Sequence, residues 1–156
     1  MKKKLWIYGL WIGLSEAVGA LSGLLSAEGT RAYRETIIRP LLAPPGWVFG
    51  VVWPILFALM GVGAARVWMA ETSSVRYRAL NLFFVQLVVN FFWSLIFFNA
   101  GAYGFALAWL LLLYALVAWM SVTFYQVDQL AGLIQIPYML WLTFAAYLNL
   151  QIWRLN

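Results

Sequence analysis

Five long apolar stretches occupy most of this 156-residue chain. They cover residues 5–27, 46–70, 79–99, 102–125 and 130–153. Each is longer than the roughly 20 residues that a helix needs to cross a hydrocarbon core of about 30 Å. Lipid offers no partner for backbone polar groups, so each stretch must be a helix. The sequence predicts an all-α integral membrane protein, a five-transmembrane-helix bundle, with residues 1–156 as one domain.

The composition excludes several classes of protein. Only 10% of the residues are charged and 65% are hydrophobic, which leaves no room for a soluble domain. The chain has no Cys and no His, which excludes disulfides, the usual zinc and haem ligands, and Ser-His or Cys-His catalysis. We expect no metal site and no required cofactor. The net charge of +5 suits anionic membrane lipid better than nucleic acid, because no basic stripe lies on a soluble element.

Basic residues predict the orientation. With the N-terminus inside, six Lys and Arg lie on the inner side and four on the outer side. Positive loops favour the cytoplasm, so we expect the N-terminus inside and the C-terminus outside a bacterial cell membrane. The inner set is Lys2, Lys3, Lys4, Arg66, Arg76 and Arg78, and the outer set is Arg31, Arg34, Arg39 and Arg154.

Glycines and prolines mark the ends and contacts of the helices. The first span holds two pairs at GxxxG spacing, which let helix backbones approach closely, and we expect them to pack within one bundle. Pro44 and Pro45 should close the long loop 28–45 and begin the second helix, where proline is tolerated. Pro54 and Pro137 are expected to bend their helices. The glycine pairs are Gly9 with Gly13 and Gly19 with Gly23.

Three of the predicted helices carry aromatic faces at helical spacing. Amides in a membrane core need partners, so Gln86 and Asn90 should face the interior. If the faces converge, they form an aromatic-walled cavity for a flat apolar ligand. A bundle core joined by polar groups, without a cavity, explains the same residues, and the residue types do not decide between the two. The faces are Phe49, Trp53, Phe57 and Met60; Gln86, Asn90, Trp93 and Phe97; and Trp141, Phe144, Ala145 and Leu148, with Asn149 beside the last.

A few charged residues raise separate questions. Glu16 lies near the middle of the first span, where a carboxylate is costly, so we expect it to face the bundle rather than lipid. The arginines of loop 28–45 either pair with a ligand's carboxylates or lie among lipid headgroups. Glu28 and Glu35 offer a third partner for them within the loop.

Several motifs of the chain resemble those of one family. Residues 44–53, PPGWVFGVVW, look like the PPxWxFGxVW signature of the TspO/MBR family, the translocator and tryptophan-rich sensory proteins once called peripheral benzodiazepine receptors. The likeness returns in residues 86–93, QLVVNFFW, in 137–141, PYMLW, and from Leu148 to Arg154. It extends over nearly the whole chain, in the same order.

This resemblance implies a five-helix bundle, often a homodimer, whose first long loop covers a cavity. The family binds porphyrins such as protoporphyrin IX and haem, and some members bind sterols or benzodiazepine-type drugs. By motif position, Trp53 and Trp141 match two cavity tryptophans tied to porphyrin chemistry. Asn90 matches a ligand-contacting asparagine, and Ala145 a small residue that lets the ligand approach. Trp47, Phe49, Trp93 and Phe144 fall at wall positions.

The chain departs from the family pattern in its first long loop, which the family uses as a lid over the cavity, and in its last helix. Leu42 stands where the family's loop often has tryptophan, and Arg39 where it has lysine. Leu150 stands at the tyrosine of the cholesterol motif, so we do not expect cholesterol as the natural ligand.

Three functions remain open from the sequence. The first is a binding protein for tetrapyrroles and similar flat hydrophobic ligands, acting in porphyrin transport or stress sensing. The second is a light-dependent protoporphyrin-degrading enzyme, with Trp53 and Trp141 as its catalytic residues. The third is a lipid- or sterol-handling or structural membrane protein.

Overall fold

The computed structural model describes residues 2–156, and all regular structure in that range is helical. Five of its segments are long and apolar enough to cross a membrane, which confirms the predicted all-α fold with five spans. In chain order the elements are α1 (Lys2–Leu25), α2 (Ala27–Thr36), α3 (Gly46–Met69), α4 (Ser74–Ser94), the π-helical turn η1 (Leu95–Asn99), α5 (Tyr103–Val127), α6 (Gln129–Leu133) and α7 (Ile136–Leu155).

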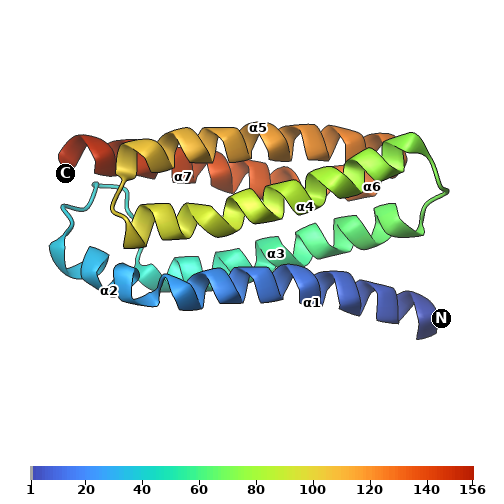
Figure 1. Ribbon diagram of the computed structural model, residues 1–156, viewed down its shortest axis with the longest axis horizontal. Helices are drawn as coiled ribbons and strands as arrows, with labels where there is room; N and C mark the ends of the chain where they lie inside the picture. The colour runs from blue at the N-terminus through green and yellow to red at the C-terminus, as the bar shows by residue number, and fades with distance from the viewer. Residues whose placement is uncertain (1) are drawn as a thin grey trace.

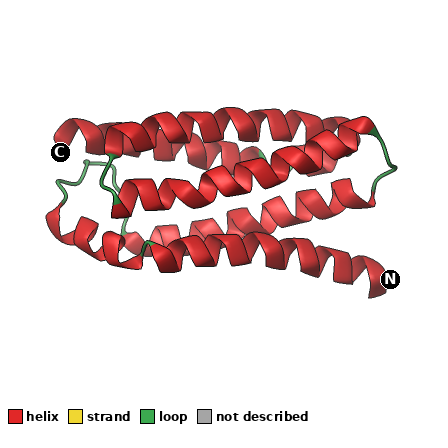
Figure 2. Cartoon of the chain, in the orientation of Figure 1, coloured by secondary structure: helices red, strands yellow, loops and turns green. Residues whose placement is uncertain are grey.

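The spans run side by side along the long axis of the molecule (Figure 2). In Figure 1, α1 and α3 form one layer, and α4, α5 and α7 form the other. α1 packs chiefly on α3, and α5 packs on both α4 and α7. The two termini lie at opposite ends of the bundle, as an odd number of spans requires (Figure 1). α2 and the segment 37–45 lie across the end that holds the C-terminus.

Small residues let α1 and α3 approach each other closely. A side chain on Gly61 of α3 would meet the backbone of Ile12 on α1, and one on Gly19 would meet the ring of Phe57. Gly19 therefore packs within the bundle as predicted. The other three glycines of the predicted pairs do not, because the space beside them is open: these are Gly9, Gly13 and Gly23.

The start of α3 is as the prolines predict. Pro45 has extended backbone angles (φ −56°, ψ 147°) and the helix begins at Gly46. α3 then continues through Pro54 to Met69. Proline has no backbone N–H, so the carbonyl four residues earlier, that of Gly50, lacks its usual helical donor.

The connection 28–45 is not a simple loop, because its first nine residues belong to the ten-residue helix α2. Tyr33 of α2 packs against Phe97 and Phe98, with ring centroids 5.5 and 5.2 Å apart. This docking stabilises a short polar helix that would be marginal alone. Only the residues after Thr36 are irregular, with a turn at residues 41–42 before the prolines.

Two of the predicted helix boundaries need correction. The third span begins at Ser74 rather than residue 79, because the Ser73 hydroxyl caps it by accepting from the Arg76 N–H at 3.1 Å. The fifth span is not one bent helix but two, α6 and α7. Pro137 cannot donate to the carbonyl of Leu133, so α6 ends there and α7 begins at Ile136.

Candidate functional site

A cavity of about 600 Å³ lies between the two layers of the bundle, at the end covered by α2. Helices α1, α3, α4 and α7 supply its walls, and α2 with the segment 37–45 supplies the cover. Its volume falls in the range of roughly 300–1,000 Å³ that is usual for small-molecule sites. This location places the cavity inside the bundle and opens it toward the lid, which we define as residues 27–45.

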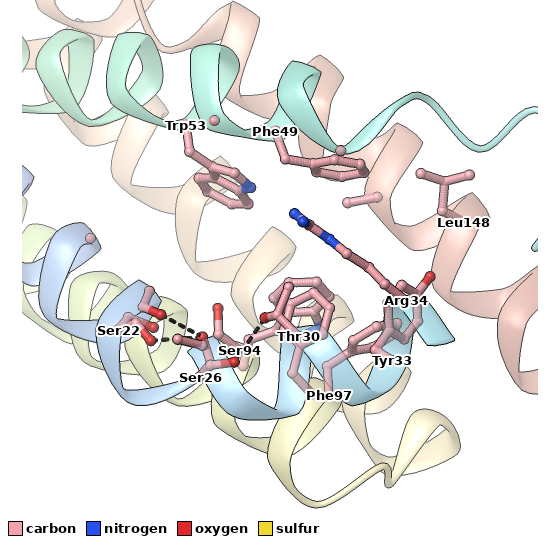
Figure 3. A pocket seen from close by; sticks show the side chains of 18 of the residues that line it. Ser22, Ser26, Thr30, Tyr33, Arg34, Phe49, Trp53, Ser94, Phe97 and Leu148 are labelled. Atoms are coloured by element: carbon pink, nitrogen blue, oxygen red, sulfur yellow. Dashed lines mark hydrogen bonds between the residues drawn. The ribbon is translucent and has the colours of Figure 1, made fainter. Parts of the chain in front are cut away.

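Aromatic rings form two opposing walls (Figure 3). Phe49 and Trp53 lie four residues apart on α3, so they point from one face of that helix. On the other side Trp93 and Phe97 stack with centroids 5.0 Å apart and planes at 27°. Two aromatic walls of this kind present ring faces and edges to a flat guest, which is the arrangement that favours stacking.

Five of the eight predicted site residues line the cavity. Asn90 and Ala145 join the aromatic residues there, from α4 and α7. These residues come from three different helices, α3, α4 and α7, and their positions in the sequence motifs were enough to group them. The five are Phe49, Trp53, Asn90, Trp93 and Ala145.

The other three predicted residues lie elsewhere. Trp141 stands behind the wall, with its ring 5.6 Å from Phe49 and 6.4 Å from Trp53, both nearly edge to face. Phe144 packs on Trp141 at 5.7 Å and likewise does not line the cavity. Trp47 is 70% exposed and is not among the lining residues, so the wall position expected for it is not found.

A polar network supports the wall from beneath. Asn90 donates to the Tyr138 hydroxyl at 2.7 Å, and that hydroxyl donates to Gln86 Oε1 at 3.0 Å. Gln86 and Tyr138 are fully buried, and Asn90 is nearly so. Of the two interpretations left open by the sequence, the structure has the one with a cavity, and a hydrogen-bonded polar core adjoins that cavity.

Hydroxyl groups line the side of the cavity formed by α1 and α2. Ser26 and Thr30 donate to carbonyls one turn earlier, at 2.8 Å each (Figure 3). Ser22 donates across to the Phe91 carbonyl of α4 at 2.9 Å. Because their hydrogens are engaged, these hydroxyls offer mainly lone pairs to a guest.

Charged groups of opposite sign occupy different parts of the cavity. Glu16 is half-buried and lines it from α1, consistent with the expectation that it faces the bundle. Arg31, Arg34 and Arg39 line it from the lid. Glu28 and Glu35 pair with none of them, since the ion pair found within residues 2–156 joins Arg66 to Asp128.

Three contacts hold the lid in place, two within it and one at the end of α1 just before it. Asn156 forms a two-way pair with Ile38, accepting from its N–H at 3.0 Å and donating to its carbonyl at 3.2 Å. Asn99 donates to the Leu25 carbonyl at 2.9 Å, where α1 meets α2. The third contact is the packing of the Tyr33 ring on Phe97 and Phe98. Burial raises the pKa of the Tyr33 hydroxyl, so this side chain stays neutral. Sequence reasoning missed these contacts, because side chains distant in the chain meet only in the folded bundle.

Several known proteins are similar in sequence to this chain over most or all of its length. A model of the TspO/MBR family matches residues 11–154. The Tryptophan-rich protein TspO of Chlorobaculum tepidum is 34% identical over 165 residues, covering 100% of this chain and 99% of that protein. The human Translocator protein is 36% identical over 156 residues, covering 97% and 91%. Protein CrtK of Rhodobacter capsulatus is 36% identical over 141 residues, covering 90% and 87%.

Proposed function

Because the chain belongs to the TspO/MBR family of integral membrane proteins, we propose that it binds tetrapyrroles such as protoporphyrin IX and haem, and similar flat hydrophobic ligands, within the bundle. The cavity between the wall of Phe49 and Trp53 and the wall of Trp93 and Phe97 carries this proposal. Transport or stress sensing is the role we assign to such binding, in keeping with relatives named Translocator protein and Tryptophan-rich sensory protein.

Stacking and apolar burial supply the affinity in this proposal. The chain has no His or Cys to ligate a haem iron strongly. Metal-free protoporphyrin IX should therefore bind about as well as haem. Haem binding far more tightly than the metal-free ring would contradict this mechanism.

The direct test is a titration of the protein in nanodiscs with protoporphyrin IX in the dark, read by tryptophan quenching. Trp53→Phe removes part of the stacking surface and should weaken binding several-fold, since an aromatic pair contributes about 0.5–1.5 kcal/mol beyond its buried area. Trp119→Phe is the matched control, because Trp119 is 55% exposed on α5 and outside the cavity. Absence of saturable binding to the wild type would refute the proposal.

A second candidate function is light-dependent oxidation of protoporphyrin IX by dioxygen. The observation that favours it is the edge-to-face contact of Trp53 with Trp141, at 6.4 Å and 86°. Trp53 adjoins the space for the excited ring and Trp141 stands behind it. Trp53 would donate one electron to the excited ring, and the reduced ring would pass it to dioxygen to form superoxide. The oxidised tryptophan pair would then take one electron from the ring, and the ring cation would combine with superoxide, so that dioxygen adds to the ring and both tryptophans are restored. No other catalytic role is assigned to them.

Illumination of the same protein and variants tests this second candidate. Product formation should need light and dioxygen and should fall in both Trp53→Phe and Trp141→Phe, but not in Trp119→Phe. Trp141→Phe is a mild change, because the buried Trp141 Nε1 has no hydrogen-bond partner among residues 2–156. Undiminished product in both variants would remove the role given to the two tryptophans.

A homodimer in a bacterial cell membrane completes the proposal. A bacterial relative covers the whole chain. Crosslinking of the protein in native membranes, followed by mass determination, would distinguish a dimer from a monomer.

A further inference from the structure

Arg34, an exposed residue of the lid, directs a cation toward the aromatic part of the cavity. Its side chain leaves α2 and extends between the walls, with the guanidinium toward Phe49 and Trp53 (Figure 3). The absence of a side chain at Gly46 makes room for it, since a Cβ there would lie 3.1 Å from Arg34 Nη2. The lid sequence thus directs a charged group inward, where a neutral residue would fit an apolar guest better.

This guanidinium has no partner of its own. Among residues 2–156 it forms no ion pair and donates no hydrogen bond, although it carries five N–H donors in a fixed fork. The nearest acidic residue in the chain, Glu35, is exposed and forms no ion pair in the described structure. An unpaired fork that reaches into a binding cavity is available to an anionic group of the guest.

Two more cations reinforce the same end of the cavity. Arg31 and Arg39 line it beside Arg34, and the acidic residue of the lining, Glu16, lies on α1 ten residues before Ser26. At 1.5 Å per helical residue that separation is about 15 Å along α1. The cavity is therefore polarised, with positive charge at the lid and a carboxylate deeper in the bundle.

We propose that Arg34, flanked by Arg31 and Arg39, is a carboxylate-binding subsite that orients a flat amphipathic acid with its carboxylates at the lid and its apolar body between the aromatic walls. Guanidinium and carboxylate form bidentate, charge-assisted hydrogen bonds, which fix direction as well as adding affinity. The inference rests on the proposed tetrapyrrole function, since protoporphyrin IX carries two propionates on one edge of its ring. An anionic lipid headgroup has the same chemistry and is the competing occupant.

The test compares two guests that differ only in charge, protoporphyrin IX and its dimethyl ester, in phosphatidylcholine nanodiscs in the dark. Arg34→Gln should weaken binding of the diacid by about tenfold and leave the diester unchanged. Arg34→Lys keeps the charge but loses the planar fork of donors, so its affinity for the diacid should lie between those of the wild type and Arg34→Gln. Arg78→Gln is the matched control, an exposed arginine of α4 that lies outside the cavity.

Each outcome has a separate meaning. Equal effects of Arg34→Gln on diacid and diester, or no effect on either, would overturn the subsite while porphyrin binding stands. A diacid preference that disappears in phosphatidylglycerol nanodiscs would assign the arginines to lipid phosphate and overturn it as well. Absence of saturable binding by either guest would instead refute the proposed function, and this inference with it.

Discussion

Tyr138 is fully buried at the centre of the bundle, where its hydroxyl links α7 to α4. Replacing it with phenylalanine leaves the fully buried Gln86 Oε1 without a donor and removes the acceptor of the Asn90 amide at the cavity wall. We expect Tyr138→Phe to lower the free energy of unfolding by about 1 kcal/mol, the scale of hydrogen bonds within membrane proteins. Thermal unfolding in detergent measures it. Tyr147→Phe, at a partly exposed tyrosine with no side-chain hydrogen bond among residues 2–156, should change little.

The sequence could predict one half of this network. Gln86 and Asn90 lie in an apolar span, and amides there must find partners, so their inward direction follows from the residue types alone. That the partner is Tyr138 does not follow. It depends on how far α7 is displaced along α4. Arg34 is a similar case, since whether a lid arginine points inward depends on how α2 docks.

At the scale of elements, Asp128 joins α5, α6 and α3. It caps α6 by accepting from the Ala131 N–H at 2.8 Å, and it receives two hydrogen bonds from Arg66 of α3, at 2.9 and 2.8 Å. The Arg66 hydrogen bonds hold the pKa of the Asp128 carboxyl below its ordinary value. A lowered pKa means that the folded protein holds the carboxylate in its charged form more strongly than the unfolded chain does.

The pH dependence of stability follows from the direction of this pKa shift. The contribution of Asp128 is fully present above its ordinary pKa of about 4 and is lost as the pH falls through the lower folded value. Asp128→Asn keeps a good capping residue but removes the charge, so it should cost about 1 kcal/mol at pH 7 and progressively less below pH 4. Melting curves of both proteins across pH test this. A constant difference at all pH values would contradict it, and Glu71→Gln, at an exposed and unpaired carboxylate, is the control.

The elements also show where prediction from sequence stops. The five spans are predictable because each needs only its own length and hydropathy. α2 is not, because its ten residues are too few and too polar to be helical alone. It depends on Tyr33 meeting Phe97 and Phe98, residues more than sixty positions away in the chain.

At the scale of the whole molecule, the two ends of the bundle differ in charge. One end carries the lysines after Met1 together with Arg66, Arg76 and Arg78, and the other carries the lid arginines with Arg154 (Figure 1). The first end has the larger number of basic residues, so it should face the cytoplasm. The lid would then open to the outer side of the membrane.

The lack of cysteine makes this orientation easy to test. We expect Thr36→Cys, at the lid, to react with a membrane-impermeant maleimide in intact cells. Ser74→Cys, at the exposed start of α4, should react only after the cells are permeabilised. The reverse pattern would place the N-terminus outside.

The contact of Asn156 with the lid, and that of Asn99 with the end of α1 beside the lid, have a consequence for kinetics. Neither side chain lines the cavity, so neither contacts a guest whether the lid is occupied or empty. Such contacts raise the barrier to entry and to exit by the same amount. Asn156→Ala should therefore speed both association and dissociation of protoporphyrin IX about fivefold in stopped-flow experiments and leave Kd unchanged. Asn81→Ala, at an exposed position of α4, should alter neither rate, and a changed Kd with unaltered rates in Asn156→Ala would contradict this assignment. The walls and Arg34 then determine how tightly a guest is held, whereas the contacts of Asn156 and Asn99 determine only how fast it enters and leaves.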